Sequence, residues 1–249
     1  VSKLMWNPYL DADSLMRSFM NGYYGAAAPY IYQYEKLLEG GLLASRVDLW
    51  IYDSPVSHKN GMLNVNCLKR YNELFDMAEE AVAGDEVLLK RVRRSRLPIQ
   101  YSELEIARTM DDGDVNEIRK KLDLFEQRTA AYEVPTLNER NNSPADYCTL
   151  YRERYLPGRT RNLAKGAKVI WSIQPAEKYK ILGETALTDE LYGGTTFVES
   201  WVGWSGSDGS FVLDMGEEKD ISSIEADFLH QLGAWILLPK KVSYSISSN

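Results

Sequence analysis

The stretches Phe211–Gly216 (FVLDMG) and Trp235–Val242 (WILLPKKV) decide the fold of the last third of the chain. Both are apolar runs interrupted by Asp, Gly or Pro, and shorter runs of this kind begin at Leu187 and Trp201. Short apolar segments separated by turn residues are typical of an all-β sandwich. We therefore expect strands from about residue 167 onwards, with candidates at 169–171, 211–214, 224–228, 235–238 and 242–246.

The first two thirds of the chain show a different pattern, in which apolar residues recur at three- and four-residue steps. This spacing places them on one face of a helix. Gly40-Gly41 is expected to end the second helix, and Pro98 to kink the fourth. The pattern predicts helices from Asp11 or Asp13 to Gly25, over about 27–39, from Asn64 or Asn66 to Val82, over 87–108, from Asp114 to about 134, and over about 144–156.

Together the two patterns predict an α+β fold with two domains. An antiparallel α-helical domain is expected over residues 1–166, and a β-sandwich over residues 167–249, with the boundary near Gly166. The strand pattern continues up to Asn249, so we expect this sandwich to be truncated.

The composition is that of a globular protein, with 44% hydrophobic and 26% charged residues and a net charge of −7. The charge is unevenly distributed. Residues 1–166 carry 23 basic and 24 acidic side chains, whereas residues 167–249 carry 6 and 12. Because binding to nucleic acid or to anionic lipid requires clustered positive charge, neither partner is expected.

Targeting and redox signals are sparse. The longest uncharged run, residues 18–34, contains Gly, Pro and five Tyr, so it predicts no membrane span. No charged segment followed by an apolar core opens the chain, so we expect no signal peptide in it. Cys67 and Cys148 fit no metal-binding spacing, and we interpret both as buried free thiols.

No catalytic constellation emerges from the spacing of polar residues. His58 lies beside the Asn60-Gly61 turn, and we expect it to be a solvent-exposed loop residue. Glu103 and Glu105 stand two positions apart on a helix, so their carboxylates should point to different faces. We therefore predict no catalytic residue. The basic cluster is interpreted as a solvated face or as arginines paired to nearby acids, and comprises Lys90, Arg91, Arg93, Arg94 and Arg96.

Aromatic side chains are the best candidates for ligand binding, because a sugar can stack its C–H face on an exposed ring. The candidates in the β part are Tyr192, Trp201 and Trp204. Trp235 lies inside an apolar run and is expected in the core. For Trp201 and Trp204, structural packing and a ligand-facing loop both stay open.

Three motifs of the helical part resemble an uncharacterised bacterial family, domain-of-unknown-function family 4838. They are Leu4–Pro8 (LMWNP), Gly22–Ala27 (GYYGAA) and Arg94–Tyr101 (RSRLPIQY). In that family a helical region follows a glycosidase-like (β/α)8 barrel, similar in arrangement to α-glucuronidases and β-hexosaminidases. The resemblance covers most of residues 1–165 and implies that residues 1–6 end the last helix of a barrel. It carries no catalytic carboxylate over to this chain.

The run from Leu187 to Val242 resembles the discoidin-like module, the coagulation factor V/VIII type C domain, which is a galactose-binding-like jelly roll. It looks most like the version appended to bacterial glycoside hydrolases. The resemblance implies a structural calcium near Asp189, with Glu190 standing where the family usually has Gly. The matching pieces are Leu187–Asp189, Gly193-Gly194, Trp201–Trp204, Asp214–Gly216, Ile221–Ile224 and Leu238–Val242.

These resemblances lead to one main expectation and one alternative. The chain is expected to be the non-catalytic C-terminal portion of a secreted bacterial carbohydrate-active enzyme, at the cell surface, in the periplasm or outside the cell. It would support an upstream barrel domain and bind a glycan or polysaccharide. We expect it to use no cofactor, with a structural calcium as the open alternative. The alternative is a protein–protein interaction or dimerisation module that binds no carbohydrate.

Overall fold

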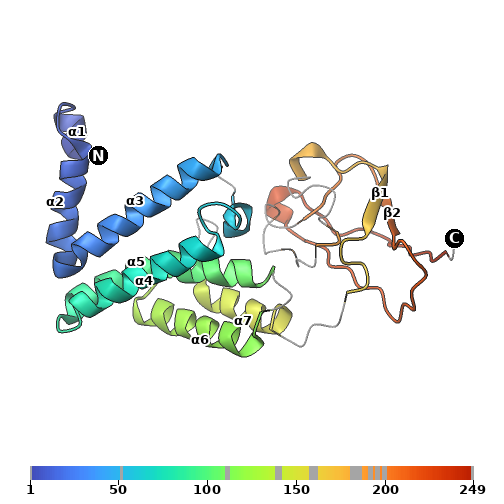
Figure 1. Cartoon of the computed structure of the whole chain (residues 1–249). Coiled ribbons are helices and arrows are strands. Elements are labelled where there is room, and N and C mark those ends of the chain that lie inside the picture. The colour runs from blue at the N-terminus through green and yellow to red at the C-terminus, as the bar shows by residue number, and fades with distance from the viewer. Residues whose placement is uncertain are drawn as a thin grey trace. The chain divides into compact units, whose positions relative to one another are not determined.

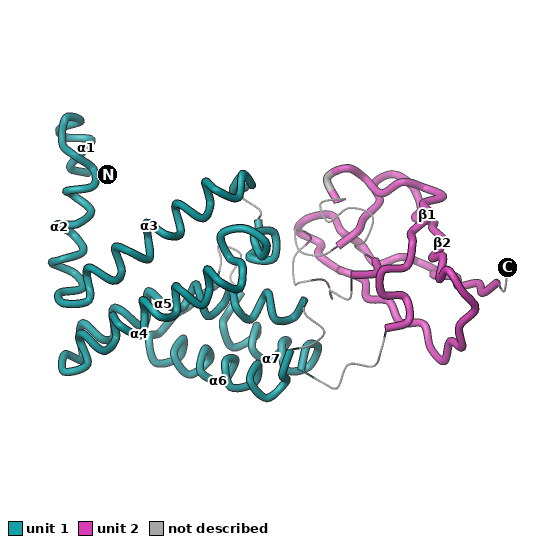
Figure 2. Tube along the Cα trace, in the orientation of Figure 1, with its two compact units in different colours: residues 1–156 teal, residues 157–249 magenta. Residues whose placement is uncertain are grey.

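The computed structural model describes residues 2–50, 53–109, 113–137, 142–156, 162–179, 187–189, 193, 197 and 201–247. Its internal contacts divide the chain into two compact units, residues 1–156 and residues 157–249 (Figure 2). We call them the helical unit and the sheet unit and describe each by itself. The described part of the chain is mostly helical, with one small two-stranded antiparallel sheet.

The helical unit is built from α-helices that pack against one another in chain order from α2 to α7 (Figure 1). Two short 3-10 turns, η1 (Gly25–Ala27) and η2 (Pro55–His58), lie between them. The helices are α1 (Ser2–Trp6), α2 (Ala12–Tyr24), α3 (Ala28–Ser45), α4 (Val65–Ala81), α5 (Glu86–Ala107), α6 (Val115–Ala131) and α7 (Pro144–Arg154).

Polar N-caps explain where these helices begin. In α2, α4, α5, α6 and α7 the side chain before the first helical residue accepts a hydrogen bond from a backbone N–H of the first turn. Such a cap satisfies donors that have no partner within the helix. The predicted starts at Asp11, Asn64 and Asp114 are thereby confirmed. The five caps are Asp11, Asn64, Asp85, Asp114 and Ser143.

One predicted interruption of a helix does not occur. Helix α3 continues through Gly40-Gly41 to Ser45, so the predicted stop is wrong. A Cβ atom on Gly41 would lie 3.3 Å from the Met62 backbone and 3.4 Å from the Tyr71 hydroxyl, so this glycine permits close packing. Helix α5 runs through Pro98, the position of the predicted kink, and the Pro98 carbonyl oxygen accepts a hydrogen bond from Ser102 Oγ at 2.8 Å.

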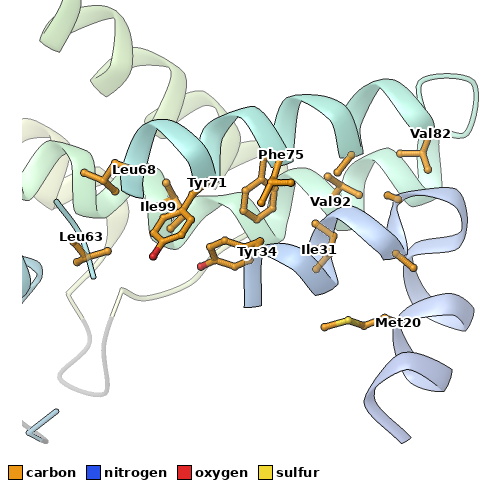
Figure 3. Close-up of a cluster of buried hydrophobic side chains, with 14 residues drawn as sticks. Met20, Ile31, Tyr34, Leu63, Leu68, Tyr71, Phe75, Val82, Val92 and Ile99 are labelled. Carbon is orange, nitrogen blue, oxygen red and sulfur yellow. The ribbon is translucent and has the colours of Figure 1, made fainter. Parts of the chain in front are cut away.

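Two clusters of buried side chains hold the helical unit together. In the first, the rings of Tyr71 and Phe75 lie 5.3 and 4.9 Å from that of Tyr34, and bring α4 against α3 (Figure 3). The second lies between α5, α6 and α7, and its fully buried members include Leu104, Leu122, Phe125, Cys148 and Tyr151. Residues on different helices therefore share each core, which explains the compactness of this unit.

The sheet unit contains β1 (Lys168–Ile173) and β2 (Ser210–Asp214), which pair antiparallel with Trp171 opposite Phe211. The register shifts between Trp171 and Ile173. Two 3-10 turns, η3 (Glu177–Tyr179) and η5 (Leu232–Ala234), accompany the sheet. The predicted strands at 169–171 and 211–214 are thereby confirmed.

The later predicted strands are not formed. Within the described residues 215–247, backbone pairing is limited to one isolated antiparallel bridge, between Gln231 and Ile236. Apolar content alone does not make a strand, because its N–H and C=O groups need a neighbouring strand as partner. Trp235 is 91% exposed, so its predicted core position is wrong.

None of the helices that the structure describes combines the length and apolarity needed to cross a bilayer.

Candidate functional site

The sheet unit gathers three aromatic rings on its two strands. Trp171 lies on β1, Phe211 lies on β2, and Trp204 precedes β2; we call these three side chains the aromatic cluster. The ring centroids are 5.6 Å apart for Trp171 and Phe211, and 6.0 Å for Trp171 and Trp204. Trp204 and Phe211 are nearly parallel, at 7° and 6.3 Å. The pairing of β1 with β2 therefore places Trp171 beside Phe211, and Trp204 packs against both rings.

Trp204 is fixed in this cluster by polar and steric contacts. Its Nε1–H donates a hydrogen bond to the Ile173 carbonyl oxygen at 2.9 Å. A Cβ atom on Gly209 would lie 2.7 Å from the indole, so this glycine lets the backbone approach the ring. Trp204 is half-buried and Phe211 is 40% exposed, so the cluster combines packing with accessible ring surface.

Of the other two predicted glycan contacts, Trp201 and Tyr192, the structure describes only Trp201. Trp201 is half-buried, and its indole lies so close to Gly193 that a Cβ atom there would be 2.1 Å from the ring. Tyr192 lies outside the described residues. The structure thus brings Trp204 to the aromatic cluster and Trp201 against the Gly193 backbone.

The loop proposed to hold calcium is attached to the start of β1. Thr188 is buried, and its hydroxyl donates to the Ala167 carbonyl oxygen at 3.1 Å, while its own carbonyl oxygen accepts from Gly166 N at 2.9 Å. Asp189 follows and is half-buried. Across the described residues, no group of three or more His, Cys, Asp and Glu side chains could hold a metal ion.

His58 is not the exposed loop residue that the sequence predicts. It is 2% exposed, and its Nε2 lies 2.9 Å from Asp53 Oδ2, which also accepts a hydrogen bond from Trp50 N. Its carbonyl oxygen accepts hydrogen bonds from Gly61 N and Leu63 N. His58 therefore organises the connection between α3 and α4. The five-residue spacing to Asp53 is the sequence signal that could have indicated this pair.

Of the five basic residues on α5, Arg93 and Arg96 are paired to acids, one of the two predicted alternatives. Arg91 Nη1 instead donates to the Tyr23 carbonyl oxygen, and Lys90 and Arg94 are exposed. Arg93 Nε contacts Glu79 Oε2 at 2.8 Å, and Arg96 Nη1 contacts Asp76 at 2.6 Å and Glu79 at 3.0 Å. Sequence reasoning missed Arg128 on α6, whose Nη2 lies 3.4 Å from Glu79. We call Asp76, Glu79, Arg93, Arg96 and Arg128 the Glu79 cluster.

The electrostatics of the Glu79 cluster follow from its burial and its three guanidinium groups. Burial raises the pKa of Glu79, but the hydrogen bond from Arg93 and the charges of Arg128 and Arg96 outweigh it, so the pKa lies below its ordinary value. Burial lowers the pKa of Arg128, and the charges of Arg96 and Arg93 lower it further.

Glu103 and Glu105 do not form a facing acid pair. Glu103 Oε1 accepts a hydrogen bond from Lys121 at 2.8 Å. Glu105 instead lies in the second core, where Oε2 accepts from Arg108 Nη2 at 2.8 Å and Oε1 accepts from the Tyr147 hydroxyl at 2.9 Å. Each carboxylate is therefore engaged with a different cation.

Comparison with known protein families matches the first part of the chain. A family model described as Domain of unknown function (DUF4838) matches residues 1–36, which comprise α1, α2, η1 and the first part of α3. The match includes the motifs at Leu4–Pro8 and Gly22–Ala27 but not the motif at Arg94–Tyr101. No curated protein and no solved structure matches the chain.

Proposed function

We propose that this chain is a non-catalytic portion of a carbohydrate-active enzyme of the glycoside hydrolase type, in which it supports a (β/α)8 barrel and binds a glycan. The family match over residues 1–36 carries the proposal, because it coincides with two of the three motifs from which the resemblance was drawn. That resemblance associates a helical region of this kind with a glycosidase-like barrel.

The sheet unit is proposed to be part of a discoidin-like β-sandwich of the jelly-roll type. The antiparallel pairing of β1 and β2 supports this assignment. Large apolar side chains further along, among them Phe228, Leu237 and Tyr244, are 46%, 67% and 54% exposed. Additional strands of a sandwich would cover such residues.

The proposed glycan site consists of Trp201 and Trp204, together with Tyr192. Near-parallel rings such as those of Trp204 and Phe211 can stack on the apolar face of a pyranose. Binding assays on a glycan array with the whole chain test this role. Loss of binding in Trp201→Ala and Trp204→Ala is expected, with Trp235→Ala as the matched control because Trp235 is 91% exposed.

Two outcomes would contradict the glycan site. One is binding that survives both substitutions. The other is a loss of binding that accompanies a melting temperature lowered by several degrees in each variant, since this is the signature of a packing defect. Trp204→Phe separates the two roles further, because it keeps a ring but loses the hydrogen bond to Ile173.

Three attendant proposals have simple tests. A structural calcium at Asp189 predicts a higher melting temperature with calcium than with a chelator, and Asp189→Ala should abolish the difference.

Location outside the cytoplasm predicts recovery of the natural protein in the secreted, periplasmic or surface fraction. The absence of catalysis would be contradicted by hydrolysis of aryl-glycosides that a point mutation in this chain abolishes.

A protein–protein interaction or dimerisation module is the second candidate, and one observation favours it. The segment containing α1 and α2 exposes Met5, Trp6, Tyr9 and Phe19 at 81%, 92%, 94% and 61%. Clustered exposed apolar side chains often mark interaction surfaces. Light scattering over a range of concentrations tests this candidate. A mass that rises with concentration and returns to that of the monomer in Trp6→Ser would support it.

A further inference from the structure

The Glu79 cluster carries more positive charge than its acids neutralise. Three guanidinium groups, from two helices, approach the carboxylate of Glu79, whose side chain is 14% exposed. The second acid, Asp76, contacts only Arg96 among the described residues, and it is 68% exposed. Three cations against two anions leave a surplus of one positive charge.

Further groups near the cluster do not remove this surplus. Lys90, one helical turn before Arg93 on α5, places its Nζ over the ring of Tyr132 at 6.0 Å. The Tyr132 side chain in turn interacts with both Arg93 and Arg128. A fourth cation, Lys90, and a neutral phenol therefore accompany the three arginines.

Arg128 is incompletely satisfied by its contacts. Its Nη2 lies 3.4 Å from both carboxylate oxygens of Glu79, which is longer than the ~2.7–2.9 Å of a strong charge-assisted hydrogen bond. Its Nη1 is buried and has no hydrogen-bond partner among the described residues. Buried donors of this kind usually have a partner, so Arg128 retains hydrogen-bonding capacity that its contacts in the cluster do not use.

Arg93 provides the accessible side of the same site. It uses Nε to reach Glu79, and its side chain is 39% exposed, compared with 13% for Arg96 and 13% for Arg128. A ligand that binds Arg93 from solvent would therefore lie close to the Glu79 carboxylate, which the two less accessible guanidinium groups also contact.

We propose that Arg93, Arg128 and Arg96 bind a small oxyanion group, a carboxylate, sulfate or phosphate, that is either a free ion or part of a sugar acid. The planar guanidinium fork matches the geometry of such groups and binds them with two parallel hydrogen bonds. The site lies in the helical unit, so it goes beyond the glycan contact proposed for the sheet unit. A bound anion would also oppose the charge repulsion that lowers the pKa of Arg128.

Calorimetric titration of the whole chain with sulfate, at constant ionic strength maintained with chloride, tests the proposal. Saturable binding is expected, and Arg128→Gln should weaken it about tenfold or more. Arg119→Gln is the matched control, because Arg119 lies on the same helix α6 but is exposed. Absence of saturable binding, or equal weakening by both substitutions, would overturn the proposal.

Glu79→Gln is a second test variant, and its affinity for the anion should rise rather than fall. Removing the competing carboxylate leaves Arg93 and Arg128 without their acid partner, so sulfate should bind more tightly and raise the melting temperature more than it does in the unsubstituted chain. A variant that sulfate does not stabilise would overturn the proposal. Glucuronate and glucose distinguish the sources: binding of glucuronate without glucose indicates a sugar acid, and binding of sulfate alone indicates a free ion.

Discussion

Glu105 and Arg108 form an ion pair inside the second core, with side chains 6% and 4% exposed. Burial alone would lower the pKa of Arg108, but the adjacent Glu105 carboxylate raises it above its ordinary value. Tyr147 donates to the same carboxylate, and burial raises its own pKa well above 10. Because two buried charges lose their hydration, such a pair adds little net stability, whereas removal of either partner alone would leave an uncompensated buried charge.

Phe75 is the residue whose truncation should cost most in the first core. It is 0% exposed and lies 4.9 Å from the ring of Tyr34, so Phe75→Ala leaves a cavity. We expect a loss of about 3–5 kcal/mol in the free energy of unfolding, measured with urea. Leu43→Ala, at a site 74% exposed, should change it by less than about 0.5 kcal/mol. Equal losses in both would contradict the assigned core.

Cys148 should be a slow thiol in the folded protein. It is a fully buried free cysteine, and burial, aided by the nearby Glu126 carboxylate, raises its pKa to about 12. Since the thiolate is the reactive form, a disulfide reagent at pH 8 should modify Cys148 only after unfolding. The variant Cys67→Ser leaves Cys148 as the one thiol to follow. Rapid modification of that folded variant would show that the site is open.

At the level of single elements, helix α5 depends on its N-cap. Asp85 Oδ1 accepts hydrogen bonds from Val87 N and Leu88 N, both at 3.0 Å. Asp85→Ala should therefore lower the free energy of unfolding by about 0.5–2 kcal/mol, as measured by chemical denaturation. Asp85→Asn retains a capping oxygen and should lose much less. Similar losses in both variants would indicate that charge, rather than the cap, is what matters.

The contact between α2 and α3 should weaken in acid. Asp13 on α2 accepts hydrogen bonds from Arg17 at 2.8 Å and from Tyr32 of α3 at 2.7 Å, and these lower its pKa from 3.8 to about 2. A depressed folded-state pKa gives stability that is complete above the unfolded value of about 4 and is lost as the pH falls towards 2.

The substitution Asp13→Asn tests this dependence on pH. The melting temperature of the unsubstituted chain should exceed that of Asp13→Asn at pH 5, and the difference should shrink by pH 2. Asp48→Asn is the control, because Asp48 lies exposed in the connection after α3. A difference that stays constant between pH 5 and pH 2 would contradict the assigned role of Asp13.

Element starts could be predicted from the sequence more reliably than element ends. Caps such as Asp114 are local signals, because the side chain bonds to its own first turn. The helix stop predicted at Gly40-Gly41 was wrong because Gly41 allows Met62 to approach closely, and this contact joins residues that are distant in the sequence. The strand predicted from Trp235 was wrong because a strand requires backbone hydrogen bonds to a neighbouring strand, and apolar content alone does not supply them.

The candidate sites, like the secondary-structure elements, could be predicted only in part from the sequence. Trp204 was indicated by its residue type, whereas its contact with Trp171 and Phe211 depends on the register of β1 against β2. Arg128 gave no signal at all, because only the packing of α6 brings it to Glu79, 49 positions earlier in the chain. The chemical character of a single residue can therefore be read from the sequence. The contacts between distant residues that assemble a site cannot, because they depend on tertiary packing.

For the molecule as a whole, the helical unit should fold without the rest of the chain. Both core clusters lie entirely within residues 1–156, so a protein made of these residues keeps its buried contacts. We expect it to retain helical circular dichroism and to unfold cooperatively on heating. The whole chain, measured in the same buffer, is the comparison. A fragment that melts without a cooperative transition would show that its stability requires residues 157–249.

The placement of tryptophan determines which optical signal can follow each unit. Trp6 and Trp50 are 92% and 69% exposed, and the two core clusters of the helical unit are described with Tyr and Phe but without Trp. Indole emission from this unit would change little when its cores come apart, whereas Trp171 and Trp204 sit within the packing of the sheet unit. A melting curve recorded by tryptophan fluorescence would therefore report on the sheet unit, and the helical unit has to be followed through its tyrosines.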